Sequence, residues 1–137
     1  MKTRILNALE KLKKNEGMTL IEIMIVVAII AILLGLVTPN LMNRLKQANV
    51  VAAKQGINVL KLALQDYALL NNGSYPEDLE TLANEGLLKA KDLRDPWGNP
   101  YQYVSPGEHD WEYDIYSYGA DGKEGGEGLD ADIVSWE

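Results

Sequence analysis

A long apolar segment near the amino terminus constrains this chain more than any other feature of its sequence. Residues 23–37 carry no charged side chain, and the segment extends back to residue 18 with Glu22 as its only charge. A helix of about 20 apolar residues spans a hydrocarbon layer of roughly 30 Å. We therefore predict a membrane-spanning helix over residues 18–38.

Two ordinary kinds of membrane segment have this pattern, a cleaved secretory signal and a permanent single-pass anchor. Residues 1–17 hold five basic and two acidic residues, and the positive-inside rule keeps such a leader in the cytoplasm. The apolar run is longer than in most secretory signals, and Thr38, Pro39 and Asn40 follow it instead of a small-residue cleavage site. An anchor therefore fits better than a secretory signal.

Glu22 is the residue that a plain anchor does not explain. A carboxylate in a membrane helix costs up to about 3 kcal/mol unless it is paired. Lys14, eight residues earlier, is the nearest basic residue on the amino-terminal side. Cleavage after Gly17 would supply a charge, because the new ammonium group of Met18 would lie four residues before Glu22. We therefore expect Glu22 to pair with this terminus or with that of a neighbouring copy.

The residues from Lys13 to Glu22, KKNEGMTLIE, resemble the leader of type IV prepilins and pseudopilins. The resemblance implies that a prepilin peptidase cuts between Gly17 and Met18 on the cytoplasmic face and that Met18 is then N-methylated. It also implies that Glu22 pairs with a neighbouring amino terminus during filament assembly. Met18 departs from the family pattern, which usually has Phe at this position.

The helix is expected to continue beyond the membrane. Gly35 and Pro39 should kink or loosen it without ending it, because proline removes one helical hydrogen bond. Residues 71–73, Asn-Asn-Gly, are a typical stop signal. We therefore predict an amphipathic second half over residues 39–72, packed against a sheet. Its apolar residues recur every three or four positions on one face, namely Val50, Ala53, Ile57, Leu60, Leu64 and Tyr67.

Residues 73–137 are predicted to form a small globular region. Residues 74–77 have the residue types of a capped helix start, and the turn-rich segment 95–100 leads into a strand over residues 101–104. A second strand is expected from Trp111 to Tyr118, and its aromatic residues fit sheet packing better than carbohydrate or base stacking. The predicted fold is therefore α+β, with a long amino-terminal α-helix packed on a small antiparallel β-sheet. The short helix is expected to end near Gly86 and to carry Leu79, Leu82, Leu87 and Leu88.

The last loop, residues 119–132, contains five glycines and five acidic residues. Glycine lets the backbone fold tightly, and carboxylate and carbonyl oxygens in a flexible loop are the ligands that Ca²⁺ takes. The acidic residues do not have the spacing of an EF-hand. On residue types alone, a calcium site and a disordered acidic loop fit this segment equally well.

The carboxyl-terminal half resembles the major pseudopilin of type II secretion systems in its segments 95–101, 105–109, 118–122 and 125–128. With the leader, the similarity covers nearly the whole chain from Gly17. It implies a type IV pilin-like fold and a calcium ion held by aspartate side chains and main-chain carbonyls. The implied ligands are Asp121, either Asp130 or Asp132, and the carbonyl of Tyr118. The metal would replace a disulfide, since the chain has no Cys.

Composition argues against other classes of function. Residues 18–137 hold 8 basic and 18 acidic residues, so this part of the chain repels nucleic acid. With no Cys, one His and no G-x-S-x-G segment, the sequence offers no nucleophile and base for acyl transfer. His109 lies in a turn, where a solvated or capping role is expected. We predict that the protein is not an enzyme.

The sequence thus predicts a structural subunit of a periplasmic pseudopilus. The resemblance implies a single-pass protein of the bacterial inner membrane, surrounded by lipid before assembly, with its carboxyl-terminal domain in the periplasm. Its implied partners are further copies of itself, minor pseudopilins, the prepilin peptidase and an inner-membrane assembly platform, and the filament would drive export of folded proteins across the outer membrane. Two alternatives stay open, a type IV pilin of a surface filament and a membrane-anchored periplasmic binding domain that never polymerises.

Overall fold

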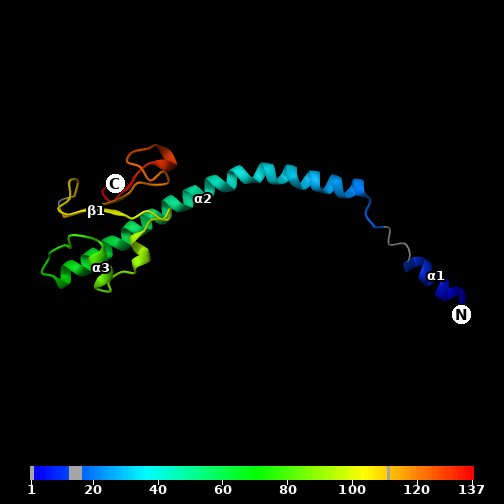
Figure 1. Ribbon diagram of the computed structural model, residues 1–137, viewed down its shortest axis with the longest axis horizontal. Helices are drawn as coiled ribbons and strands as arrows, with labels where there is room; N and C mark the ends of the chain where they lie inside the picture. Colours follow the sequence, from blue (N-terminus) through cyan, green and yellow to red (C-terminus); the bar gives the residue numbers. More distant parts are fainter. Residues whose placement is uncertain (1, 13–16, 111) are drawn as a thin grey trace. The chain divides into compact units, whose positions relative to one another are not determined.

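The computed structural model describes residues 2–12, 17–110 and 112–137, and residues 13–16 of the predicted leader lie outside this part. The chain divides into two compact units, Met1–Leu41 and Met42–Glu137. Helices and strands are labelled in Figure 1 where there is room. The helices are α1 (Lys2–Leu12), α2 (Leu20–Leu70) and α3 (Glu80–Asn84), with short 3-10 helices η1 (Ala90–Leu93) and η2 (Gly128–Asp130). The strands are β1 (Gln102–Val104), β2 (Asp114–Ser117) and β3 (Ile133–Val134).

Helix α2 begins at Leu20, two residues after the predicted start at residue 18, and ends at Leu70, two residues before the predicted end at residue 72. Its carboxyl-terminal end is set by Asn72 and Gly73, which adopt φ angles of 56° and 84°. The Gly73 N–H then bonds to the carbonyl of Ala68 at 2.7 Å, which satisfies one of the last helical carbonyls.

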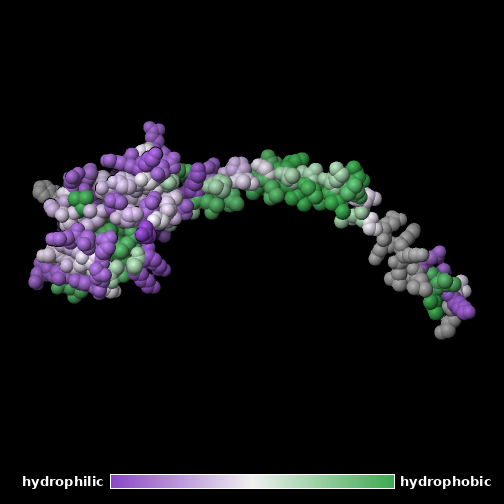
Figure 2. All heavy atoms as spheres, viewed as in Figure 1, coloured by the Kyte–Doolittle hydropathy of each residue, from purple (hydrophilic) through white to green (hydrophobic). Residues whose placement is uncertain are grey.

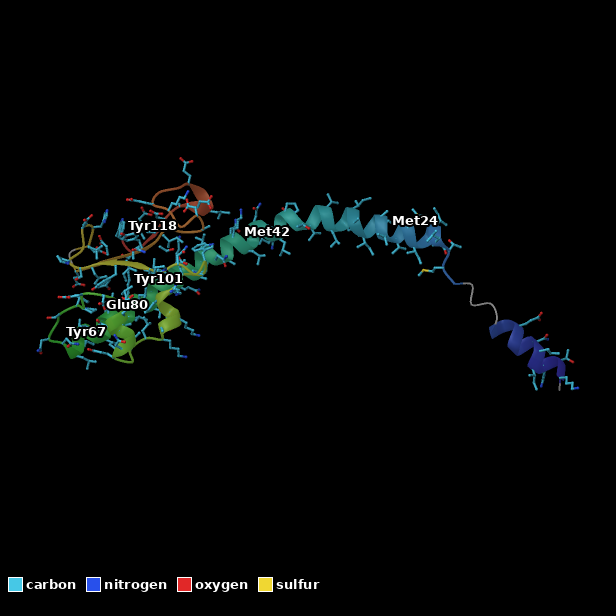
Figure 3. All side chains as sticks on the ribbon, viewed as in Figure 1. Met24, Met42, Tyr67, Glu80, Tyr101 and Tyr118 are labelled. Atoms are coloured by element: carbon cyan, nitrogen blue, oxygen red, sulfur yellow. The ribbon has the colours of Figure 1, made fainter. Side chains whose placement is uncertain are left out.

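The second half of α2 supplies one wall of the core in the unit Met42–Glu137. The predicted apolar face is confirmed, because Ala53, Ile57, Leu60 and Leu64 are buried and Val50 and Tyr67 pack against them. Tyr101 lies against this helix (Figure 3), and its hydroxyl donates to the carbonyl of Ala53 at 3.2 Å. Burial, with a smaller effect of the Asp95 carboxylate, raises the pKa of Tyr101 to about 12, so the hydroxyl keeps its proton.

The three strands form one antiparallel sheet in the order β1-β2-β3. Tyr103 lies opposite Ile115, and Ser117 lies opposite Ile133. Ile115 and Ile133 join Tyr101 and Tyr113 in the core that α2 covers. The aromatic residues of the hairpin therefore serve packing, as predicted.

The strands differ from the prediction in two ways. Both hairpin strands are shorter than expected, since β1 begins at residue 102 and β2 at residue 114. Residue 111, the expected start of the second strand, lies outside the described residues, and the N–H groups of residues 108–110 bond to the carboxylate of Asp114. Strand β3 was not predicted, because it has only two residues and is defined by its pairing with the end of β2.

Helix α3 is also shorter than the predicted helix. The carboxylate of Asp78 accepts the Thr81 N–H at 2.9 Å at its start, and Gly86, with a φ angle of 75°, follows its end. Leu82 lies on α3 and is buried, whereas Leu79 precedes the helix and Leu87 and Leu88 follow it. The placement of Leu79, Leu87 and Leu88 on the helix was therefore wrong, as was the helix start at residues 74–77, although all three leucines contribute to the core.

Side chains from distant segments hold the carboxyl-terminal tail in place. Lys61 on α2 donates from Nζ to the carbonyl of Ser135 at 2.6 Å. The ring of Trp136 stacks on His109 with centroids 3.9 Å apart. These contacts anchor the residues that follow the Gly-rich loop.

Candidate assembly and metal sites

The first half of α2 buries none of its apolar side chains within its own chain. Every large apolar side chain from Leu20 to Leu41 is at least 45% exposed. Figure 2 shows this segment as an almost continuous hydrophobic surface. By length and composition it could cross a membrane. So much exposed apolar surface requires lipid or another protein to cover it.

Glu22 takes part in a reciprocal pair of hydrogen bonds at the start of this segment. Its Oε2 accepts the Thr19 N–H at 2.7 Å, and the Thr19 hydroxyl accepts the Glu22 N–H at 3.3 Å. This arrangement is a capping box, which satisfies two N–H groups at the start of a helix. The sequence pointed only to a cationic partner for Glu22, and this local one was not predicted.

The predicted cleavage site lies between helices. Residues 17–19 precede the first helical residue of α2, and Met18 is 68% exposed. An exposed, non-helical peptide is the kind of segment that proteases cut. Met18 directly precedes Thr19, so a new terminus there would lie next to the capping box.

Gly35 and Pro39 lie within α2, and the helix runs through both positions as predicted. Pro39 has no N–H to give to the carbonyl of Gly35. The adjacent Thr38 hydroxyl donates to the carbonyl of Leu34 at 2.6 Å, so this hydroxyl is satisfied within its own helix. That Gly35 and Pro39 let the helix kink stays a prediction.

The conformation of the loop 119–132 depends on its glycines. All five have positive φ angles, between 60° and 97°. A Cβ atom at Gly119 would lie 2.7 Å from the carbonyl oxygen of Ala131, and one at Gly126 would collide with the carbonyl oxygen of Asp130. Glycine at these two positions therefore allows both ends of the loop to meet.

The three predicted aspartate ligands differ in their surroundings. Asp121 is exposed, and its Oδ1 accepts the Lys123 N–H at 3.1 Å. Asp130 is exposed within η2. Asp132 is half-buried, and its Oδ2 accepts the Gly125 N–H at 3.0 Å.

Asp132 also has a buried oxygen without a partner. Its Oδ1 is the one buried side-chain oxygen or nitrogen, among the described residues, that makes no hydrogen bond. A buried carboxylate oxygen without a donor is costly, and a cation would remove that cost. This observation favours Asp132 over Asp130 as a ligand.

The acidic side chains of the described residues do not form a cluster of three that could hold a metal. Calcium, however, also takes main-chain carbonyls. The carbonyls of Asp130 and Ala131 lie at the closing point of the loop, beside Gly126 and Gly119. The side chain of Tyr118 packs edge-on against Tyr116 with centroids 5.5 Å apart, so its role as a ligand would rest on its main chain. The loop thus offers one unpaired carboxylate oxygen, that of Asp132, and main-chain carbonyls, which are oxygen ligands of the kind that calcium takes.

Asp114 is a buried carboxylate that was not predicted from the sequence. It is 2% exposed, and its two oxygens accept the N–H groups of Glu108, His109 and Asp110, each at 2.9 Å. Nδ1 of His109 lies 3.0 Å from Oδ2. Burial alone would raise the pKa of Asp114, but these hydrogen bonds outweigh burial and lower it to about 2. Its position between the apolar Tyr113 and Ile115 was the only sequence signal.

Comparison with known proteins places the chain in a family. Residues 40–136 match the family described as "Type II secretion system (T2SS), protein G". The chain belongs to this protein G family. A second match, the prokaryotic N-terminal methylation motif, covers residues 12–38 and so includes Gly17, Met18 and Glu22. The resemblance found in the leader and in the carboxyl-terminal segments is confirmed.

Curated relatives support the protein G assignment along most of the chain. Type II secretion system core protein G of Pseudomonas aeruginosa is 45% identical over 141 residues, covering 91% of this chain and 97% of that protein. The core protein G of Vibrio cholerae is 40% identical over 142 residues, covering 93% of this chain and 96% of that protein.

A solved structure supports the fold. The crystal structure of the major pseudopilin from the type 2 secretion system of enterohaemorrhagic Escherichia coli matches with a TM-score of 0.58 and 30% identity. The match covers 72% of this chain and 95% of that one. The pilin-like fold predicted from the sequence, a long helix packed on a small antiparallel sheet, is therefore confirmed.

Proposed function

We propose that this protein G family member is the structural subunit of a type II secretion pseudopilus, and that it polymerises after cleavage at Gly17 and N-methylation of Met18. The observation that carries this proposal is the contrast within α2. Residues 20–41 leave their apolar side chains exposed, whereas residues 42–137 have a core of their own. An apolar half-helix of this kind suits lipid before assembly and other copies of the chain after it.

Glu22 would set the register between copies. In an apolar surrounding, its carboxylate requires a positive partner, and the ammonium group of a neighbouring copy's first residue supplies one. The capping box with Thr19 supports this role, because it holds the carboxylate at the very start of the helix.

The leader and the domain would lie on opposite sides of the inner membrane. The net positive leader stays in the cytoplasm, where the prepilin peptidase acts, and residues 42–137 face the periplasm. Minor pseudopilins and an inner-membrane platform would take part in assembly. The filament, not any reaction catalysed by the chain, would drive export of folded proteins across the outer membrane.

Calcium would hold the loop 119–132 closed. Asp132 is the best-supported ligand because of its unpaired buried oxygen, with Asp121 and the Tyr118 carbonyl as further candidates and Asp130 less favoured. The metal supplies a crosslink between the start and end of the loop, which a small domain without cysteines lacks.

The intact mass of the chain tests the assembly proposal. The full chain is co-expressed with a prepilin peptidase, extracted from membranes and weighed by mass spectrometry. We expect the loss of residues 1–17 and the gain of one methyl group. An unprocessed chain that stays monomeric when intact cells are crosslinked would contradict the proposal and favour a plain anchored domain.

Thermal unfolding of the full chain in detergent tests the calcium proposal. We expect the melting temperature to rise by several degrees when calcium replaces a chelator, since a ligand at about 100 times its Kd adds about 2.7 kcal/mol. Asp132→Asn should remove this rise, whereas Asp66→Asn, at an exposed position on α2, should keep it. An equal melting temperature with calcium and with chelator would refute the site.

A further inference from the structure

A buried network of hydrogen bonds joins the turn at residues 95–99 to the start of the loop 119–132. Its two side chains, Asp95 and Ser117, are 5% and 0% exposed and lie 22 positions apart in the sequence. A carboxylate is costly to bury unless it is hydrogen-bonded, so the partners of Asp95 show which segments it supports.

The first part of this hydrogen-bond network is the turn that Asp95 stabilises. Its Oδ1 accepts the N–H groups of Trp97 at 3.1 Å and Asn99 at 2.8 Å. Its own N–H bonds to the carbonyl of Asn99 at 2.7 Å. Asp95 thus fixes the turn with one carboxylate oxygen and leaves the other for a different segment.

The second part runs through Ser117, at the end of β2. Its hydroxyl donates to Oδ2 of Asp95 at 2.7 Å and accepts the Gly119 N–H at 3.1 Å. A serine hydroxyl has one proton to donate, and here that proton goes to the carboxylate. The lone pairs of the hydroxyl are therefore free to accept the N–H of Gly119. The negative charge of Asp95 thus fixes the direction of both hydrogen bonds of Ser117.

Gly119 is the position where the loop closes. It has a φ angle of 74° and lies against the carbonyls of Ala131 and Asp130. Its N–H belongs to the same peptide unit as the carbonyl of Tyr118. A bond that orients this N–H also orients that carbonyl, since the peptide unit is planar.

A second contact connects the same turn to the loop. A Cβ atom at Gly122 would lie 3.2 Å from the side-chain nitrogen of Asn99, so the loop passes directly over the turn. The turn therefore supports the loop at two points, one polar and one steric.

We propose that Asp95, acting through Ser117, is a positioning residue that holds the start of the loop 119–132 in the arrangement that binds a divalent cation. The inference rests on the calcium site proposed above for its ligand, but the support of the loop by Asp95 stands on the contacts alone. Groups that hold metal ligands in place without touching the metal commonly change affinity by about 10–100-fold when they are removed.

Ser117→Ala is the sharpest test, because it removes the connecting hydroxyl and leaves the turn bonds of Asp95 intact. Ser135→Ala is a matched control, since Ser135 is also buried and its hydroxyl also accepts a main-chain N–H, that of Ile115 at 3.0 Å. Both full-length variants are measured in detergent for calcium affinity by titration calorimetry. Without calcium, hydrogen exchange of residues 118–122 and the melting temperature are also measured.

We expect Ser117→Ala to weaken calcium binding by about 10–100-fold and to speed exchange at residues 118–122. Ser135→Ala should lower the melting temperature to a similar degree but leave affinity within about twofold of the original chain. The proposal is overturned when both variants change affinity and loop exchange equally, or when Ser117→Ala changes neither.

The two proposals can fail separately. When the unmodified chain binds no calcium, the calcium site is lost, and exchange at residues 118–122 decides alone whether Asp95 supports the loop. Faster exchange in Ser117→Ala than in Ser135→Ala then supports it, and equal exchange refutes it.

Discussion

The unit Met1–Leu41 leaves the apolar side chains of α2 exposed, whereas the unit Met42–Glu137 has an apolar core. In the first, every large apolar side chain of α2 is exposed. In the second, Leu60, Leu64, Leu82 and Ile115 are completely buried. One helix contributes to both units, so the difference lies in what surrounds each half and not in the type of secondary structure.

The two units also differ in whether their carboxylates are exposed or buried. The first unit places Glu22 and Thr19 at the start of the helix, where Glu22 is exposed and available to a partner. The second unit buries Asp95 and Asp114 and saturates both with hydrogen bonds from its own chain. The first unit therefore leaves its apolar side chains and Glu22 open to lipid or other copies, whereas the second satisfies Asp95 and Asp114 within its own fold.

The largest expected effect follows from removing the carboxylate of Glu22 in the first unit. Glu22→Ala should abolish filament assembly, because the ammonium group of a neighbour would then lie unpaired in an apolar surrounding at a cost of about 3–5 kcal/mol. Crosslinking of cells that express the whole secretion system measures the assembled fraction. Glu77→Ala, which removes an exposed carboxylate from the second unit, is the control. Normal assembly of the Glu22 variant would end the idea that this residue sets the register.

The second effect is on stability, and it should differ between the buried and the exposed side of α2 in the second unit. Leu60→Ala should destabilise the domain by about 3 kcal/mol, since Leu60 is completely buried and its loss leaves a cavity. Leu62→Ala, at a position 62% exposed, should cost less than about 0.5 kcal/mol. Chemical denaturation of the full chain in detergent measures both. Similar losses in the two variants would show that the outer side of the helix is also covered.

The third effect concerns pH and should be confined to the second unit. The pKa of Asp114 is lowered to about 2 in the folded chain, against about 3.9 when unfolded. Its stabilisation is therefore complete above the unfolded value and is lost as pH falls from about 4 to about 2. The loss should amount to roughly 2 kcal/mol.

Denaturation curves recorded across this pH range measure the effect. Asp114→Asn should be less stable near neutral pH and should lack most of the decline below about pH 4. Asp78→Asn provides a control at an exposed aspartate whose pKa is lowered by its hydrogen bonds to Thr81. An equal decline in the original chain and in Asp114→Asn would place the acid sensitivity elsewhere.

The smallest effect concerns the helix start of the first unit. Thr19→Ala should weaken the capping box by about 1 kcal/mol and speed hydrogen exchange of residues 20–23 in detergent micelles. Thr38→Ala removes a hydroxyl that bonds to a carbonyl inside the same helix, and should leave this exchange unchanged. Equal exchange in all three chains would indicate that Glu22 is not held by Thr19.

The sequence by itself predicted much of the architecture. Helical periodicity identified the buried face of α2, because residues three and four apart on a helix share one face whatever they pack against. The stop at residues 71–73 was also predictable, since Asn72 and Gly73 tolerate positive φ angles. The apolar run likewise indicated a membrane segment, and the pseudopilin family was indicated by the resemblance of the leader and of the carboxyl-terminal segments.

The tertiary structure decided what depends on residues far apart in the chain. Strand β3 exists only through its pairing with β2, so two apolar residues gave no strand signal. Asp95 resembles an ordinary turn acid in the sequence and Asp114 a polar residue of a strand, and their burial follows from packing that no local pattern describes. For the same reason, no local pattern distinguishes Asp130 from Asp132 as a proposed ligand. Whether an oxygen is buried and unpaired depends on how the loop folds back on the domain, and only the three-dimensional arrangement determines that.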